Sequence, residues 1–275
     1  MNSDDALPRA RAKAATTYNA AADHFDDEPL TFWARTGTRT IERLGLHPGA
    51  RVLDVGCGTG ASALPAAAAV APDGHVIGID LADRLLERAR DKARTHGLTN
   101  VEFRVGDMTA TGLPDESFDA VVSVFSVFFV PDMVGLLREL WRMVRPGGQL
   151  AVTTWGPDIF APVYGRWLEA VKAVRPDLHQ SFNPWDRITE PAAVVALLRD
   201  GGATEATAEP EDAVQPLRTP EDWWTVVVGS GLRGTVDQMS PDDAARVRED
   251  NLRWIAENGV DQIATNAIYA TARKP

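Results

Sequence analysis

Along residues 51–155, the hydrophobic and polar positions follow two patterns in turn, one typical of strands and one typical of helices. Short apolar runs of β-prone residues are each followed by a segment whose apolar residues recur at helical spacing, and turns rich in Gly and Pro separate them. The predicted strands are residues 51–55, 76–80, 101–105, 121–124 and 150–154, and the predicted helices are residues 61–70, 83–96 and 136–144. Because strands and helices alternate, the pattern predicts a parallel sheet wound with helices on both faces.

The two ends of the chain follow a different pattern. Two amphipathic segments precede the first strand, and after residue 155 the rhythm is interrupted by two aromatic-rich insertions, residues 156–190 and 210–259. The elements predicted in these regions are helices at residues 9–22, 30–44 and 191–199 and strands at residues 204–209 and 263–272. The sequence thus predicts three parts, residues 1–45, 46–155 and 156–275.

Three closely spaced glycines stand directly after the first predicted strand. Gly56, Gly58 and Gly60 follow Asp54, which lies inside that strand. Glycine tolerates positive φ and has no side chain, so such a turn lets a small ligand approach the backbone. An acid at the end of the second strand, Asp80, also satisfies a loose dinucleotide fingerprint, which leaves a nicotinamide cofactor open at this point.

The form Asp54-x-Gly56-x-Gly58-x-Gly60 resembles motif I of the class I methyltransferases that use S-adenosyl-L-methionine. Four further segments resemble the family's second strand, adenine-contacting turn, fourth strand and fifth-strand start, in that order: residues 76–80, 106–108, 118–123 and 140–150. The resemblance implies an α/β, Rossmann-like, seven-stranded doubly wound sheet. In that fold the last strand is antiparallel and lies between the fifth and sixth, and helical lid insertions cover the site.

The resemblance also implies which residues bind the cofactor: Asp54, Gly56, Cys57, Gly58, Gly60, Asp80, Leu81, Asp107, Met108 and Ser123. The Asp80 carboxylate is expected to accept hydrogen bonds from the ribose hydroxyls, a charge-assisted arrangement. Asp107 is expected to accept from the adenine amine, with Leu81 and Met108 against the ring. In this family residues 46–155 would form the cofactor-binding core and residues 1–45 a helical lid.

Aromatic residues outside the core predict the methyl acceptor's site. Six of the eight tryptophans lie in or beside the two late insertions, which suggests a largely apolar acceptor. The expected substrate-binding residues are Tyr18, Phe25, Trp33, Ser126, Trp155, Trp185 and Trp223. The alternative is that these rings only pack the lid. His179, the histidine of the first insertion, is the candidate general base, and a surface position is its alternative.

The composition of the chain limits the kinds of binding partner and the location that we expect. The formal net charge of -11 opposes attraction to nucleic acid, and no apolar segment is long enough to span a membrane. A single cysteine and no secretory signal favour a cytoplasmic protein, and no metal-ligand spacing is present. Two other functions remain open, an NAD(P)-dependent oxidoreductase and a non-methylating protein with this fold. The sequence determines neither the acceptor nor the oligomeric state.

Overall fold

The computed structural model describes residues 6–179 and 183–275. Residues 1–5 of the predicted amino-terminal lid and residues 180–182 of the first insertion lie outside the described residues. None of the described helices is long and apolar enough to cross a membrane.

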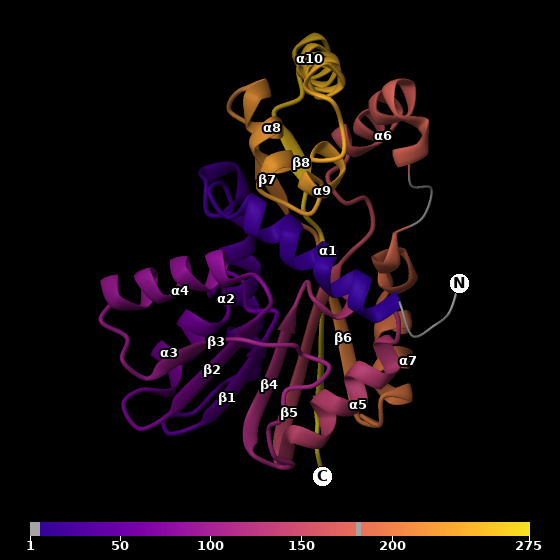
Figure 1. The fold of residues 1–275 in the computed structure, drawn as a ribbon. Coiled ribbons are helices and arrows are strands. Elements are labelled where there is room, and N and C mark those ends of the chain that lie inside the picture. Colours follow the sequence, from indigo (N-terminus) through magenta and orange to yellow (C-terminus); the bar gives the residue numbers. More distant parts are fainter. Residues whose placement is uncertain (1–5, 180–182) are drawn as a thin grey trace.

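A seven-stranded sheet forms the centre of the molecule, in the order β3-β2-β1-β4-β5-β9-β6 (Figure 1). Its strands are β1 (Arg51–Val55), β2 (His75–Asp80), β3 (Val101–Val105), β4 (Phe118–Val124), β5 (Val144–Trp155), β6 (Ala206–Glu211) and β9 (Ala267–Arg273). The first five are parallel, and β9 runs antiparallel to both β5 and β6. The predicted doubly wound sheet, with its antiparallel last strand between the fifth and sixth, is confirmed.

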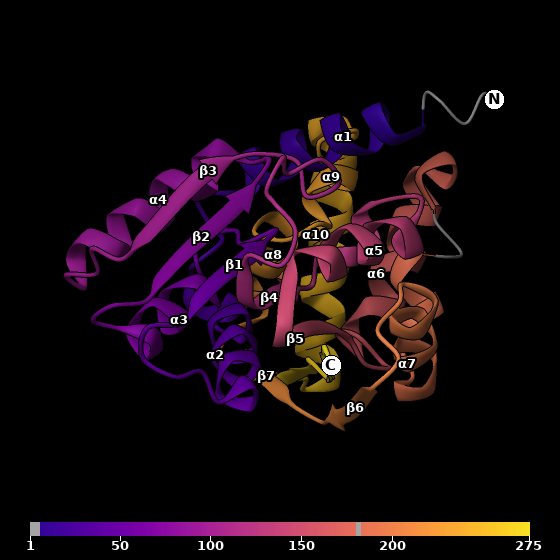
Figure 2. The same cartoon turned by 90° about the horizontal axis from the view of Figure 1, so that it is seen from below.

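Side chains of β4 alternate between two apolar cores. Val121 belongs to the core formed with α5 (Met133–Met143) and α7 (Pro191–Asp200). Ala120 and Val122 belong to the core formed with three other helices, namely α2 (Phe32–Leu44), α3 (Ala63–Val70) and α4 (Asp83–Thr95). Figure 2 shows the two groups of helices on different sides of the strands. This alternation is the period of two of a strand, and it buries both faces of the sheet.

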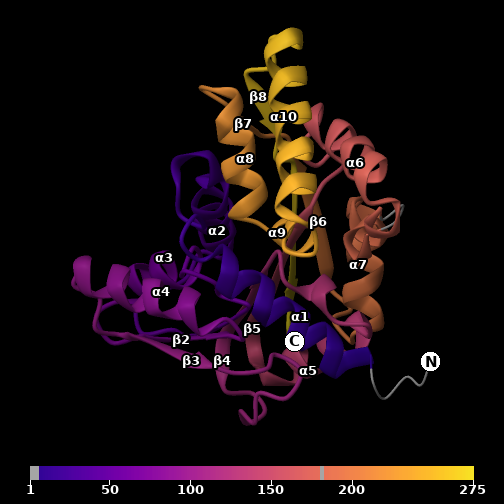
Figure 3. The same cartoon turned by 45° about the horizontal axis from the view of Figure 1, so that its top comes forward.

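The leading helix and the late insertions form a lid beyond one end of the sheet (Figures 1 and 3). The lid consists of α1 (Ala6–Ala21), α6 (Val163–Val174), α8 (Pro220–Val228), α9 (Arg233–Val236), α10 (Pro241–Asn258) and a small sheet of β7 (Val214–Pro216) and β8 (Gln262–Ala264). Short 3-10 turns connect it to the core: η2 (Glu28–Leu30), η3 (Val127–Phe129), η4 (Pro176–Leu178) and η5 (Pro184–Ile188). The indole N–H of Trp223 on α8 donates to Asn251 on α10 at 2.8 Å, and both residues are fully buried.

The predicted final strand is divided into two. β8 pairs with β7 in the lid, whereas β9 enters the main sheet. The break falls at Asn266, whose carbonyl accepts from Gly156 at 2.8 Å and whose side chain accepts from Ala213 at 3.0 Å. These two hydrogen bonds replace the regular hydrogen bonds between paired strands, so the chain passes at Asn266 from one sheet to the other.

Several predicted strand boundaries differ from the structure, among them the start of β4, which is Phe118 instead of residue 121, and two of the differences have a structural reason. β6 continues through Pro210, which the sequence assigned to the second insertion, because an edge strand tolerates the missing N–H of proline. β5 begins at Val144 instead of residue 150. The Gly- and Pro-containing segment before residue 150 was predicted as a turn, but in the structure it belongs to the strand as an irregularity, where Gly147 has a φ of 76°.

Candidate functional site

The glycine turn after β1 is held in a left-handed backbone conformation. Gly56 and Gly58 have φ of 67° and 52°, which residues with a Cβ adopt only with strain. The N–H groups of Gly56 and Cys57 donate to the carbonyl of Ile79 at 2.7 and 3.1 Å, which fixes the turn against β2. A Cβ on Gly56 would lie 2.4 Å from Cβ of Ser126, so a larger residue would displace the segment that follows β4.

The Asp80 carboxylate ends β2 beside this turn. Its oxygens accept from the N–H of Gly58 at 2.9 Å and of Ala82 at 2.8 Å. Burial raises the pKa of Asp80 above its ordinary value, and these backbone donors oppose the shift. Asp80 therefore organises the glycine turn and still presents an acceptor to the space beside it.

That space is a cavity of about 110 Å³, which we name the loop cavity. It brings together most of the residues predicted to bind a cofactor, along with several predicted for the acceptor. The predicted residues that line it are Tyr18, Phe25, Trp33, Gly56, Cys57, Gly58, Asp80, Leu81, Met108 and Ser126. Segments far apart in sequence thus meet at the carboxyl ends of β1, β2 and β4, as a doubly wound sheet requires.

Four predicted cofactor residues lie close to the loop cavity but outside its lining. Asp107 forms an ion pair with Arg11 of α1 and accepts from the N–H of Thr109 at 2.8 Å. Ser123 is fully buried and hydrogen-bonds to the Ser126 hydroxyl, which also donates to the carbonyl of Val55 at 3.0 Å. Asp107 and Ser123 therefore stabilise the segments that form the walls of the loop cavity.

The other two of the four, Gly60 and Asp54, belong to the glycine turn and its strand. The N–H of Gly60 donates to the carbonyl of Cys57 at 2.8 Å, which closes the turn. Asp54 is buried on β1, and its Oδ2 accepts from the Ser62 hydroxyl at 2.7 Å. Its Oδ1 has no hydrogen-bond partner among the described residues. Burial raises the pKa of this carboxyl to about 7, with the nearby Asp80 acting in the same direction.

The charges of the site suit a cationic nucleoside. Among its described residues, the loop cavity has a carboxylate, Asp80, in its lining and no lysine or arginine. S-adenosyl-L-methionine carries a ribose diol and positive charge, which this carboxylate suits. A pyrophosphate would find no cationic side chain in this lining.

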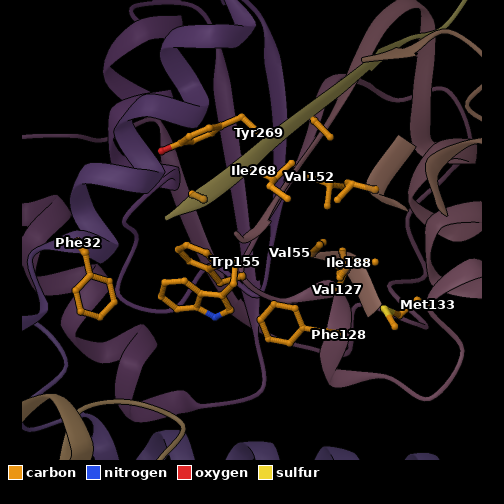
Figure 4. Close-up of a cluster of buried hydrophobic side chains, with 14 of the residues drawn as sticks. Phe32, Val55, Val127, Phe128, Met133, Val152, Trp155, Ile188, Ile268 and Tyr269 are labelled. Carbon is orange, nitrogen blue, oxygen red and sulfur yellow. The ribbon is translucent and has the colours of Figure 1, made fainter. Parts of the chain in front are cut away.

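A second and larger cavity of about 710 Å³, which we name the aromatic cavity, lies beneath the lid. Its walls come from α1, η3, α6, η5 and α9. The predicted acceptor residues Tyr18, Trp33, Trp155 and Trp185 line it. Trp155 at the end of β5 packs against Phe32 of α2, with 5.9 Å between ring centroids, and Figure 4 shows both rings in the buried cluster.

Two residues predicted for the acceptor's site, Trp223 and His179, do not line either cavity. Trp223 is fully buried in the lid, where its N–H is satisfied by Asn251, so it packs the lid itself. His179 is not among the lining residues either, although its neighbour Leu178 is. The His179 Nδ1 is buried without a hydrogen-bond partner among the described residues. The structure brings neither side chain to the place where an acceptor could bind.

The two cavities share a wall made of Ala14, Tyr18, Trp33, Phe125 and Phe129. The Tyr18 ring meets Phe129 edge-on, with 5.5 Å between centroids. Burial raises the pKa of the Tyr18 phenol, and Asp80 adds to this effect, so the phenol stays protonated. The shared wall is the place where a ligand in one cavity can meet a ligand in the other.

Sequence reasoning missed Phe125 and Phe129 in this wall. Phe125 has φ of 51°, held by its N–H bond to Thr153 at 2.8 Å and by stacking on Trp155 at 3.9 Å between centroids. Its signal was its position directly after β4, at the sheet edge where ligands bind.

Comparison with known proteins agrees with this geometry. Residues 52–148 match a family model described as a methyltransferase domain. The chain is 30% identical to nocamycin O-methyltransferase of Saccharothrix syringae over 279 residues, covering 93% of this chain and 96% of that protein. It is 35% identical to an aklanonic acid methyltransferase of Streptomyces sp. (strain C5) over 144 residues, 52% of this chain and 66% of that one. The solved structure of the [4+2]-cyclase SpnF matches 88% of this chain and 80% of its own, with 26% identity and a TM-score of 0.53.

A Rossmann-like sheet with a glycine turn, an acid at the end of β2 and a lid is the architecture of an enzyme that uses a nucleoside cofactor. The chain belongs to the class I S-adenosylmethionine-dependent methyltransferases. Its cofactor is S-adenosyl-L-methionine, and the oxidoreductase alternative is not supported.

Proposed function

We propose that this methyltransferase acts on a small, largely apolar, ring-containing acceptor bound in the aromatic cavity. The observation that carries this proposal is the wall of Phe128, Trp155, Trp167 and Trp185 under the lid. The aromatic cavity's volume of about 710 Å³ falls in the range of pockets that hold drug-sized ligands. Flat aromatic walls favour a flat partner through stacking and edge contacts.

The proposed roles of the chain are binding, orientation and exclusion of water. Bound S-adenosyl-L-methionine supplies an electrophilic methyl group on its sulfonium. Asp80 accepts from the ribose hydroxyls, the backbone of Gly56 and Gly58 lies against the cofactor, and Leu81 and Met108 contact the adenine. The shared wall then aligns the acceptor for in-line transfer.

The predicted cofactor residues outside the loop-cavity lining position the residues that line it. Asp54, Gly60 and Ser123 hold the glycine turn and the end of β4, and Asp107 ties the core to α1. A base role for His179 stays a prediction of the sequence alone. A cytoplasmic location and the absence of a nucleic-acid partner are also proposals, supported by the acidic charge and by Cys57, which is free and buried.

The test is turnover with a panel of hydroxylated and carboxylated aromatic compounds, followed by mass spectrometry of S-adenosylhomocysteine and methylated product. We expect transfer to at least one of them. Trp185→Ala should lower kcat/KM for that acceptor by about tenfold, while Trp254→Ala, on α10 outside the cavity lining, should not. Consumption of an aromatic compound without S-adenosylhomocysteine would instead indicate a non-methylating activity, and loss of activity in both variants would contradict the assigned cavity.

A further inference from the structure

The aromatic cavity has an unusual balance of charge for this protein. The chain holds 39 acidic and 28 basic residues, yet the charged side chains in the described lining are Lys13 and Arg187. The described part of the wall contains no Asp or Glu. An acidic protein has thus placed only basic side chains among the charged residues of this described lining, and Lys13 can attract an anion there.

Lys13 occupies a definite position relative to the reaction. Ala10, Lys13, Ala14, Thr17 and Tyr18 form one face of α1 and line the cavity, at the spacing of a helix face. Ala14 and Tyr18 belong to the shared wall. A cation on this face therefore lies next to the boundary between the cofactor and the acceptor.

The same lining offers no group suited to removing a proton. Its described residues include no His, Asp or Glu, and its two phenols, Tyr18 and Tyr164, stay protonated because burial raises their pKa values. Tyr164 accepts a hydrogen bond from Asn183 at 3.2 Å. An acceptor that already carries a negative oxygen needs no protein base.

We propose that the acceptor is an aromatic acid that binds as an anion, with its charged oxygen on the Lys13 side of the aromatic cavity. This rests on the proposed function of that cavity. A lone pair of the ionised oxygen forms the new bond to the methyl carbon as the bond from that carbon to sulfur breaks. The product is neutral, no proton is released in the step, and the attraction to Lys13 that held the substrate is lost.

The experiment compares 1-hydroxy-2-naphthoate with 1-hydroxy-2-naphthamide, which has the same rings and no carboxylate. Binding to the full chain saturated with S-adenosylhomocysteine is measured by calorimetry. Since Lys13 is exposed to solvent, the acid should bind about three- to tenfold more tightly than the amide, and the difference should shrink at high salt. Equal dissociation constants, or a preference for the amide, would overturn the proposal.

Substitutions at Lys13 test whether this residue supplies the positive charge that binds the acid. Lys13→Met should bring the acid and the amide to within about twofold of each other, while Lys13→Arg should keep the preference. Lys172→Met is the matched control, because Lys172 is an exposed lysine of α6 outside the cavity lining. An unchanged preference in Lys13→Met would overturn the role of Lys13. If neither compound binds, the ring-containing acceptor itself is wrong, whereas amide binding without a preference for the acid overturns only the anion.

Discussion

At the scale of single residues, Asp80 serves two purposes. Its carboxylate accepts the N–H of Gly58 and of Ala82, so it fixes the glycine turn to the end of β2. It also lines the loop cavity, where the cofactor's ribose is proposed to lie. A carboxylate held by two donors is pre-oriented, which lowers the cost of binding.

Asp80→Ala should weaken binding of S-adenosyl-L-methionine by about tenfold or more, because it removes charge-assisted hydrogen bonds. Isothermal titration calorimetry measures the dissociation constant, and circular dichroism checks the fold. Asp73→Ala is the control, since Asp73 is exposed in the turn before β2. An unchanged dissociation constant in a folded Asp80→Ala protein would place the ribose elsewhere.

At the scale of elements, α1 connects the core to the lid. Arg11 pairs with Asp107 on the core side. On the lid side α9 packs closely, since a Cβ on Gly234 would lie 2.7 Å from the hydroxyl of Thr17. Helix α1 therefore lies over both cavities and contacts both parts of the molecule.

Cofactor binding should slow hydrogen exchange in α1 and α9 as well as in the glycine turn. The reason is that α1 lines the loop cavity through Ala14 and Tyr18, and surface elements open more readily than a central sheet. Exchange followed by mass spectrometry, with and without S-adenosylhomocysteine, measures this. Helix α7 provides an internal reference, because none of its residues lines either cavity. Protection confined to residues 56–60 would contradict the assignment of α1 as part of the closed site.

At the scale of the whole molecule, a buried carboxylate lies in the central strands of the sheet. Asp54 is on β1, between β2 and β4. Burial raises its pKa from 3.8 to about 7. The unfolded chain therefore ionises this group more readily than the folded one, and its contribution to stability is present below the ordinary pKa and is lost as the pH rises to about 7.

The free energy of unfolding of the cofactor-free protein, compared with that of Asp54→Asn, should therefore fall between pH 4 and pH 7. The slope should reach at most about 1.4 kcal/mol per pH unit. Urea unfolding at several pH values provides both free energies. A difference that is constant, or that grows with pH, would show that Asp54 is ionised in the folded protein throughout.

The sequence by itself determined the elements of the core and the glycine turn. Strand periodicity, the spacing of Gly56, Gly58 and Gly60, and the acid that ends β2 are properties of short segments. They therefore sufficed to predict that the first five strands are parallel, and their resemblance to the motifs of a known family predicted the cofactor. The boundaries at Val144 and Pro210 were missed, because an irregularity and an edge position depend on neighbouring strands.

Only the tertiary structure decided which aromatic residues meet the acceptor. Trp185 and Trp223 are the same residue type in equivalent insertions, yet one lines the aromatic cavity and the other packs against Asn251. Phe125 and Lys13 enter the site because β4 and α1, distant in sequence, converge at the carboxyl edge of the sheet. A residue's burial and charge environment arise from such long-range contacts, and local patterns carry no information on them.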